Sequence, residues 1–187
     1  MIQITAGFWL LLGWFWLING WQLLLIILSA AILHELGHCI VLWTAGAHIR
    51  CLRISVCGAV LETDGQHLSY GQELAAVLAG PMTNLFSAAA LLTGDRPWTT
   101  AAAGAHLLLC CFNLLPLRPL DGGKALYLSI SWALGPAVAE RVASVLSGVT
   151  GLLLAAGLVW VMWKSGGSLW LFPAVCGILG TAIRETQ

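Results

Sequence analysis

Charged side chains are scarce in this chain: Asp, Glu, Lys and Arg make up only 9% of its 187 residues. A soluble domain carries about 25% of such residues, and the mean hydropathy here is +0.90. The formal net charge is zero, and no basic run or pattern of the kind that binds nucleic acid is present. We therefore expect an integral membrane protein that contacts the lipid bilayer and no nucleic acid.

Cysteine pairs at a metal-binding spacing are also lacking. None of the six cysteines forms a Cys-x-x-Cys pair, and most lie in apolar segments. We interpret them as small buried hydrophobic residues. Cys51 and Cys57 could form a disulfide, but the cytosolic location predicted below would keep them reduced.

Long apolar segments, in contrast, are abundant, and six of them are candidates for crossing the membrane. The first has no preceding basic residue and no signal-peptide cleavage site, so we expect it to be retained. Asn19-Gly20 predicts a tight turn between the first two segments. The six segments are residues 2–18, 21–45, 72–93, 98–115, 142–163 and 169–183.

Two connections are longer than simple turns. Residues 49–56 partly alternate apolar and polar side chains, and with residues 59–63 they predict a short β-hairpin or pair of strands. The apolar run 125–136 is too short to span a bilayer and predicts a re-entrant or interfacial segment. The expected fold is an all-α integral membrane protein with about six transmembrane helices, a short membrane-associated β-hairpin and this re-entrant or interfacial segment.

The second apolar segment contains His34-Glu35-Leu36-Gly37-His38. Two histidines four residues apart on a helix differ by about 40° around its axis, so both imidazoles can reach one metal ion. The glutamate falls beside that metal, where it can accept a proton from a bound water. Such a pattern arises by chance about once in 200 chains of this composition. It predicts one Zn²⁺ per chain and hydrolysis, with two hydrogen-bonded core histidines as the alternative.

A catalytic zinc usually keeps three protein ligands, so the pattern requires a third. His48 and His67 lie in the polar connection, where we expect them to be solvated. His106 lies in the fourth apolar segment and could reach the metal. Asp121 is better placed chemically, because it follows a helix broken by prolines and precedes two glycines. Its alternative role is that of N-cap for the helix that begins near Gly122.

Two asparagines, Asn84 and Asn113, lie in apolar segments. A buried amide there must find partners, and it could donate a hydrogen bond to a developing oxyanion or to a substrate backbone. The alternative is a structural hydrogen bond between helices, worth about 0.6 kcal/mol. Gly80-Pro81, shortly before Asn84, is expected to let helix backbones approach closely and to kink its helix.

Three motifs occur in a specific order along the chain. They are His34-Glu35-Leu36-Gly37-His38, Ala79-Gly80-Pro81-Met82-Thr83-Asn84, and Asn113-Leu114-Leu115-Pro116 followed by Leu120-Asp121-Gly122. Together they resemble the site-2 intramembrane metalloproteases, and most closely the stage IV sporulation protease branch. The resemblance covers nearly the whole chain and implies a single intramembrane metalloprotease domain over residues 1–187. Many members of the family carry a PDZ or CBS domain, and in this respect we expect the chain to depart from them, with neither domain.

The resemblance also implies roles for individual residues. The metal ligands would be His34, His38 and Asp121. Glu35 would be the general base, and Asn84 and Asn113 would act near the catalytic centre. The implied reaction is hydrolysis of a peptide bond in or near a transmembrane segment of a membrane protein substrate, as in regulated intramembrane proteolysis, with membrane regulatory or inhibitory proteins as further partners.

Two other classes of protein share part of this pattern. One is a membrane protein that binds metal without catalysis, such as a transporter. The other is a membrane zinc protease of a different family, which would share the first motif only.

Basic residues predict the orientation of a multi-pass chain. With six spans, one side has Arg50, Arg53, Arg118, Lys124, Arg141 and Arg184. The opposite side has Arg96 and Lys164. We therefore expect a cell-membrane protein whose termini and active-site access are cytosolic.

Overall fold

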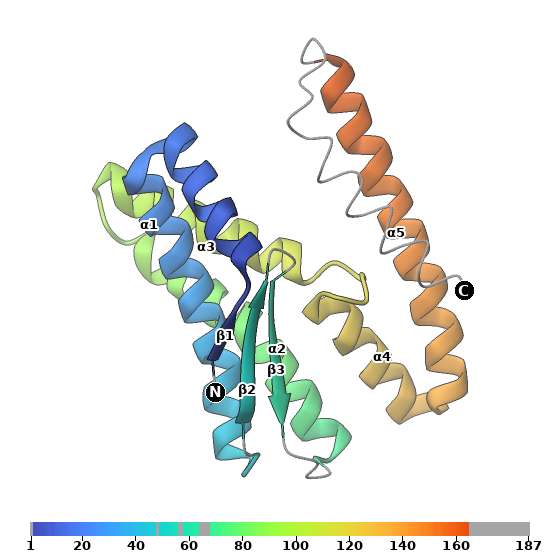
Figure 1. The fold of residues 1–187 in the computed structure, drawn as a ribbon. Coiled ribbons are helices and arrows are strands. Elements are labelled where there is room, and N and C mark those ends of the chain that lie inside the picture. Colours follow the sequence, from blue (N-terminus) through green and yellow to red (C-terminus); the bar gives the residue numbers. More distant parts are fainter. Residues whose placement is uncertain (1, 48, 56–57, 64–67, 165–187) are drawn as a thin grey trace. The chain divides into compact units, whose positions relative to one another are not determined.

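The computed structural model of the chain describes residues 2–47, 49–55, 58–63 and 68–164. Figure 1 shows its elements. In chain order they are β1 (Ile2–Ile4), α1 (Ala6–Thr44), β2 (Ile49–Ser55), β3 (Gly58–Thr63), α2 (Tyr70–Leu91), α3 (Pro97–Asn113), α4 (Asp121–Leu134) and α5 (Pro136–Lys164). They belong to two compact units, Met1–Asn113 and Leu114–Gln187, so the single domain expected over residues 1–187 stays a prediction.

Helix α1 consists of two arms. Its 39 residues are interrupted at Gly20, whose φ of 80° and ψ of 168° are not helical. In Figure 1 the dark blue arm and the lighter blue arm fold back on each other. Only glycine adopts this backbone conformation without strain, and the turn predicted at Asn19-Gly20 is confirmed.

Three described helices are long and apolar enough to cross a membrane, namely α1, α2 and α5. Helix α3 has 17 residues, which is at the short limit for a span. The sixth predicted span, residues 169–183, lies outside the described residues. The membrane class is thus supported, whereas the number of six spans stays a prediction.

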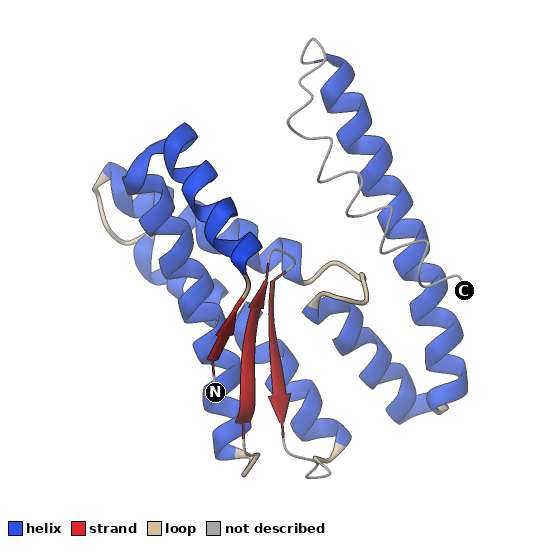
Figure 2. Cartoon of the chain, in the orientation of Figure 1, coloured by secondary structure: helices blue, strands red, loops and turns tan. Residues whose placement is uncertain are grey.

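The first unit also contains a three-stranded sheet in the order β1-β2-β3, drawn in red in Figure 2. β1 runs parallel to β2, with Ile2 opposite Leu52, and β3 runs antiparallel to β2. The expectation that the first span begins at residue 2 is therefore wrong. Ile2–Ile4 pair with a strand, and helix begins at Ala6. Isoleucine is β-branched and favours strands, so this tripeptide can pair with β2 as readily as it can extend a helix.

Strands β2 and β3 occupy nearly the residues expected for a strand pair. Residues 56–57, which would form the turn of the hairpin, lie outside the described residues. The association of this sheet with the membrane stays a prediction.

Small side chains form the interior of the first unit. Ala30, Ala88 and Ala103 are at most 1% exposed, whereas Leu17 is 80% and Trp43 77% exposed. Soluble proteins bury their large apolar residues instead, while membrane helices pack through small ones. The burial pattern therefore fits a lipid environment, as the composition predicts.

The second unit pairs α4 with α5. Gly135, with a φ of 89°, separates the two helices, and Pro136 begins α5, a position where its missing N–H is not needed. At 14 residues α4 is too short to span a bilayer. It covers most of the run 125–136 but begins four residues earlier, at Asp121. The expectation that this segment is re-entrant or interfacial stays a prediction.

The turn within α1 can be tested with a matched pair of glycines. Gly20→Ala should destabilise the protein by about 1–2 kcal/mol, because alanine is strained at positive φ. Gly13→Ala lies in the helical part of α1 with no atom within 4 Å of the added methyl group, and should be neutral or slightly stabilising. Thermal unfolding of both variants in one detergent measures the difference, and equal midpoints would contradict the assignment.

Candidate metal centre

His34 and His38 place two imidazole nitrogens next to each other in the second arm of α1. The two residues are 4% and 8% exposed, and their Nε2 atoms are 3.2 Å apart. Two nitrogens bound to one tetrahedral zinc at 2.0–2.1 Å are about 3.3–3.4 Å apart. The pair therefore fits two ligands of a single zinc ion.

The proton on His38 is fixed by the backbone of α2. Its Nδ1 lies 2.7 Å from the carbonyl oxygen of Ala76. Because a carbonyl can only accept a hydrogen bond, Nδ1 must donate, and Nε2 of the neutral ring keeps its lone pair. Such a carbonyl partner on the second nitrogen is typical of metal-binding histidines.

Gly80 allows α2 to lie directly against both rings. A Cβ atom at this position would collide with Nε2 of His38, and would lie 2.6 Å from Cε1 of His38 and 2.8 Å from Cε1 of His34. Ala76, Gly80 and Asn84 share one face of α2, since they follow at intervals of four residues. The close approach predicted from Gly80-Pro81 is confirmed.

The partner glycine on α1 is Gly37, between the two histidines. A Cβ atom there would collide with Oγ1 of Thr83 and would lie 2.7 Å from the carbonyl oxygen of Ala79. Both helices thus use glycine at the contact, and the two backbones come together where the imidazoles need partners.

Asn84 links His34 to a third histidine. Its side chain is fully buried; Nδ2 lies 3.1 Å from Nδ1 of His34, and Oδ1 lies 3.0 Å from Nδ1 of His106. His106, on α3, is 2% exposed. The sequence predicts His106 only as a candidate metal ligand, and the structure shows in addition that its Nδ1 contacts Asn84. The sequence signal for such a role is that His106 is a titratable residue alone in an apolar segment, because such residues usually have a function.

The remaining candidates of the first unit lie on α1 and α3. Glu35 follows His34 directly and is half-buried. Asn113 is the last residue of α3, and its Nδ2 donates to the carbonyl oxygen of Leu109 at 3.1 Å. His48 and His67 lie outside the described residues.

Asp121 belongs to the second unit, where it is the first residue of α4. The N-cap of α4 is Leu120, so the alternative prediction of Asp121 as N-cap is wrong. Asp121 is 8% exposed. A Cβ atom on Gly122 would collide with the carbonyl group of Leu114 and lie 2.5 Å from the carbonyl oxygen of Leu115, so the preceding loop packs closely on the start of this helix.

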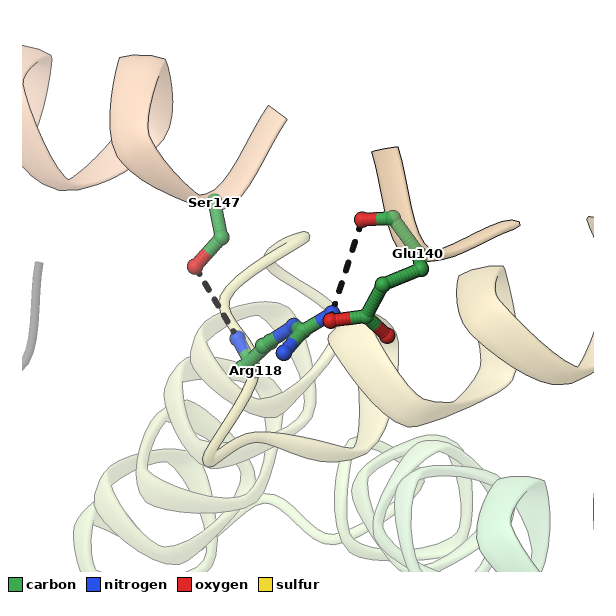
Figure 3. Close-up of polar contacts among 3 residues, drawn as sticks. All are labelled: Arg118, Glu140 and Ser147. Atoms are coloured by element: carbon green, nitrogen blue, oxygen red, sulfur yellow. Dashed lines mark hydrogen bonds and ion pairs between the residues drawn. The ribbon is translucent and has the colours of Figure 1, made fainter. Parts of the chain in front are cut away.

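That loop is held by α5, as Figure 3 shows. The backbone N–H of Arg118 donates to Oγ of Ser147 at 3.2 Å. The guanidinium group of Arg118 forms an ion pair with the carboxylate of Glu140. These contacts restrain the chain three residues before Asp121 and thereby limit where its carboxylate can point.

The first unit therefore brings together four of the polar residues considered above, His34, His38, Asn84 and His106. Asp121 lies in the other unit, and its role as third ligand is a proposal that we take up below.

Comparison with known proteins gives relatives of one kind. A protein of Mycobacterium tuberculosis named as a zinc metalloprotease, Rip3, is 31% identical over 172 residues, and the match covers 79% of this chain and 43% of the relative. A Synechocystis protein named as a zinc metalloprotease, sll0528, is 27% identical over 117 residues, covering 58% of this chain and 31% of the relative. No family model matches the chain.

A solved structure is also similar. The site-2 protease from Methanocaldococcus jannaschii has a TM-score of 0.70 at 23% identity, covering all of this chain and 90% of that one. The match shows a shared fold. Together with the sequence relatives it confirms the relationship to the site-2 protease family that the three motifs predicted. The chain spans less than half the length of the two sequence relatives. Its own activity is therefore proposed in the next section.

The contact at Gly80 leads to a prediction about metal binding. Gly80→Ala should lower zinc affinity by at least about 10-fold, because the added methyl group displaces both imidazoles. Gly71→Ala, on the same helix with no atom within 4 Å of the new methyl group, is the control and should bind zinc normally. Competition with a chelator measures both affinities, and unchanged binding by Gly80→Ala would contradict the site.

Proposed function

We propose that this chain is an intramembrane zinc metalloendopeptidase that hydrolyses a peptide bond in or near a transmembrane segment of a membrane protein. One observation carries the proposal above all: two buried imidazole nitrogens lie 3.2 Å apart in an apolar helix, with a glutamate following the first. The family relationship and the apolar exterior of the helices support it.

The proposed ligands of one zinc ion are His34, His38 and Asp121. Asp121 completes the usual set of three, since its carboxylate is a hard anionic donor on a restrained helix start. When bound, the zinc ion would supply Lewis acidity that lowers the pKa of a water molecule and polarises a carbonyl group.

Glu35 is the proposed general base. It accepts a proton from the attacking water and later returns this proton to the leaving amide nitrogen. The carboxylate is attached one residue after His34, so α1 holds the base and a ligand in fixed relation. Its half-buried position keeps the group accessible to water.

Two amides have proposed roles beside this base. Asn113 lies where α3 ends, and its Nδ2 can move from the carbonyl of Leu109 to a developing oxyanion or a substrate backbone. Asn84 contacts two histidines, which favours positioning of His34. A direct donor role for Asn84 would require Nδ2 to leave His34.

The alternatives have less support. A transporter needs a relay of buried titratable groups across the membrane. Among the described residues the buried titratable polar groups are His34, His38, His106 and Asp121, and His106 contacts an amide. A membrane zinc protease of another family would not share the second and third motifs.

The proposed substrate is a helix in the membrane, and this imposes a condition on it. A scissile bond in a helix is surrounded by side chains and its carbonyl is hydrogen-bonded, so the segment must unwind before water can attack. We propose membrane regulatory or inhibitory proteins as further partners. A membrane-bound transcription-factor precursor as substrate follows from the proposed sporulation branch.

The proposed orientation rests on the number of basic residues on each side of the membrane. Six lie on the side of the termini and two on the opposite side, so we propose that the termini are in the cytosol. A cysteine introduced near residue 187 should resist an impermeant thiol reagent on intact cells and react after the cells are lysed. A cysteine introduced at Asp95, in the connection between α2 and α3, should be labelled on intact cells. The reverse pattern would overturn the orientation.

The role of the base predicts the effect of a nearly isosteric change. Glu35→Gln should retain zinc and lower cleavage by about 100-fold or more, because the proton acceptor is lost and the ligands remain. Glu73→Gln, a change of another half-buried glutamate at the start of α2, should cleave normally. Substantial turnover by purified Glu35→Gln protein would refute the assignment.

The role of the third ligand predicts a loss of metal. Asp121→Ala should reduce zinc well below one ion per chain and abolish cleavage, because two histidines alone hold zinc weakly. Asp95→Ala removes an exposed carboxylate and should change neither. Elemental analysis of the purified chains decides the question, and full zinc content in Asp121→Ala would show that the third ligand is another residue.

A further inference from the structure

The two histidines of α1 differ in how their protons are fixed. His38 faces the carbonyl oxygen of Ala76, which can only accept, so its Nδ1 always donates. His34 faces the amide of Asn84, which has a donor at one end and an acceptor at the other. The proton position on His34 therefore depends on which end of this amide it meets.

A half-turn of the Asn84 amide exchanges its oxygen and nitrogen and leaves both contacts in place. If Nδ2 faces His34, Nδ1 of His34 accepts, and the proton of the neutral ring lies on Nε2, pointing at Nε2 of His38 3.2 Å away. If Oδ1 faces His34, Nδ1 donates and the Nε2 lone pair points to the position between the two rings. Only the second arrangement lets both histidines bind one metal ion.

The other end of the amide selects between these arrangements. His106 lies against it with Nδ1 at 3.0 Å, and all three side chains are at most 4% exposed. When Oδ1 accepts from His34, Nδ2 points at His106 and needs an acceptor. A neutral imidazole with its proton on Nε2 provides this acceptor at Nδ1. Without one, a buried N–H group would lack a hydrogen bond, at a cost of about 1–3 kcal/mol.

We propose that His106 is a positioning residue that acts through Asn84 to keep the proton of His34 on Nδ1 and so directs the Nε2 lone pair to zinc. The inference rests on the zinc site of the proposed function and extends that site to α3. The His106–Asn84–His34 chain thus joins α3, α2 and α1 by side chains from three separate regions of the sequence.

The test compares two substitutions of His106 in the full-length chain in detergent. His106→Gln retains a carbonyl acceptor, whereas His106→Leu fills similar space without one. Apparent affinity for Zn²⁺ from chelator competition and the visible spectrum after loading with Co²⁺ are measured for each. His106→Leu should weaken binding by about 10–100-fold and alter the cobalt spectrum, while His106→Gln should stay within a few-fold of the unsubstituted chain.

A second background separates positioning from packing. In Asn84→Asp a carboxylate oxygen accepts from Nδ1 of His34 whatever lies on the other side. Adding His106→Leu to Asn84→Asp should therefore change zinc affinity by no more than about 3-fold. Cys110→Ala, a loss of another buried side chain one turn further along α3, should leave the cobalt spectrum unchanged and is the packing control.

The outcomes distinguish the two proposals. If His106→Leu binds zinc as well as the unsubstituted chain, or weakens binding equally in the Asn84→Asp background, the positioning role is overturned and the zinc site stands. If His106→Leu does not fold, a His106→Gln chain with strongly reduced zinc affinity overturns the role and one with near-normal affinity supports it. A chain that binds no zinc before any substitution would overturn both proposals.

Discussion

A buried imidazole needs a hydrogen-bond partner on the nitrogen that faces away from a metal, and this requirement governs how α1 and α2 pack. The partners are the carbonyl of Ala76 and the amide of Asn84, eight residues apart on α2, and they meet histidines four residues apart on α1. Gly80 lies between the two partners and removes the Cβ atom that would separate the helices. A shift of α2 by one residue along α1 would break both of these contacts with Nδ1 atoms. The orientation of the imidazoles and the packing of the two helices therefore depend on the same alignment of α1 with α2.

The parts of the fold that could be predicted from sequence have local causes. The turn at Gly20 follows from a residue that tolerates positive φ, and the strand pair follows from alternation within a polar stretch. The placement of His34 and His38 on one helix face follows from a repeat of 3.6 residues per turn. Even the close contact at Gly80 has a local signal, a glycine and a proline in an otherwise apolar helix.

The parts that could not be predicted depend on partners far away in the chain. Ile2–Ile4 read as the start of a span because two isoleucines and one glutamine are too short a stretch to predict a strand, and the strand that pairs with them follows α1 in the sequence. His106 has no motif, and its role depends on an amide 22 residues away. For Asp121 the sequence leaves His106 open as a competing ligand, and no local pattern reveals that Nδ1 of His106 contacts Asn84.

The parallel pairing of β1 with β2 has a consequence for the order of synthesis. Ile2 pairs with Leu52, so about 50 residues must be made before β1 has a partner. At ~5–20 residues per second this takes about 3–10 s. Both arms of α1 are complete before then, and their pairing around Gly20 requires only local contacts. The sheet is therefore the last part of this region to form, and it closes a loop that already contains His34 and His38, the two proposed metal ligands.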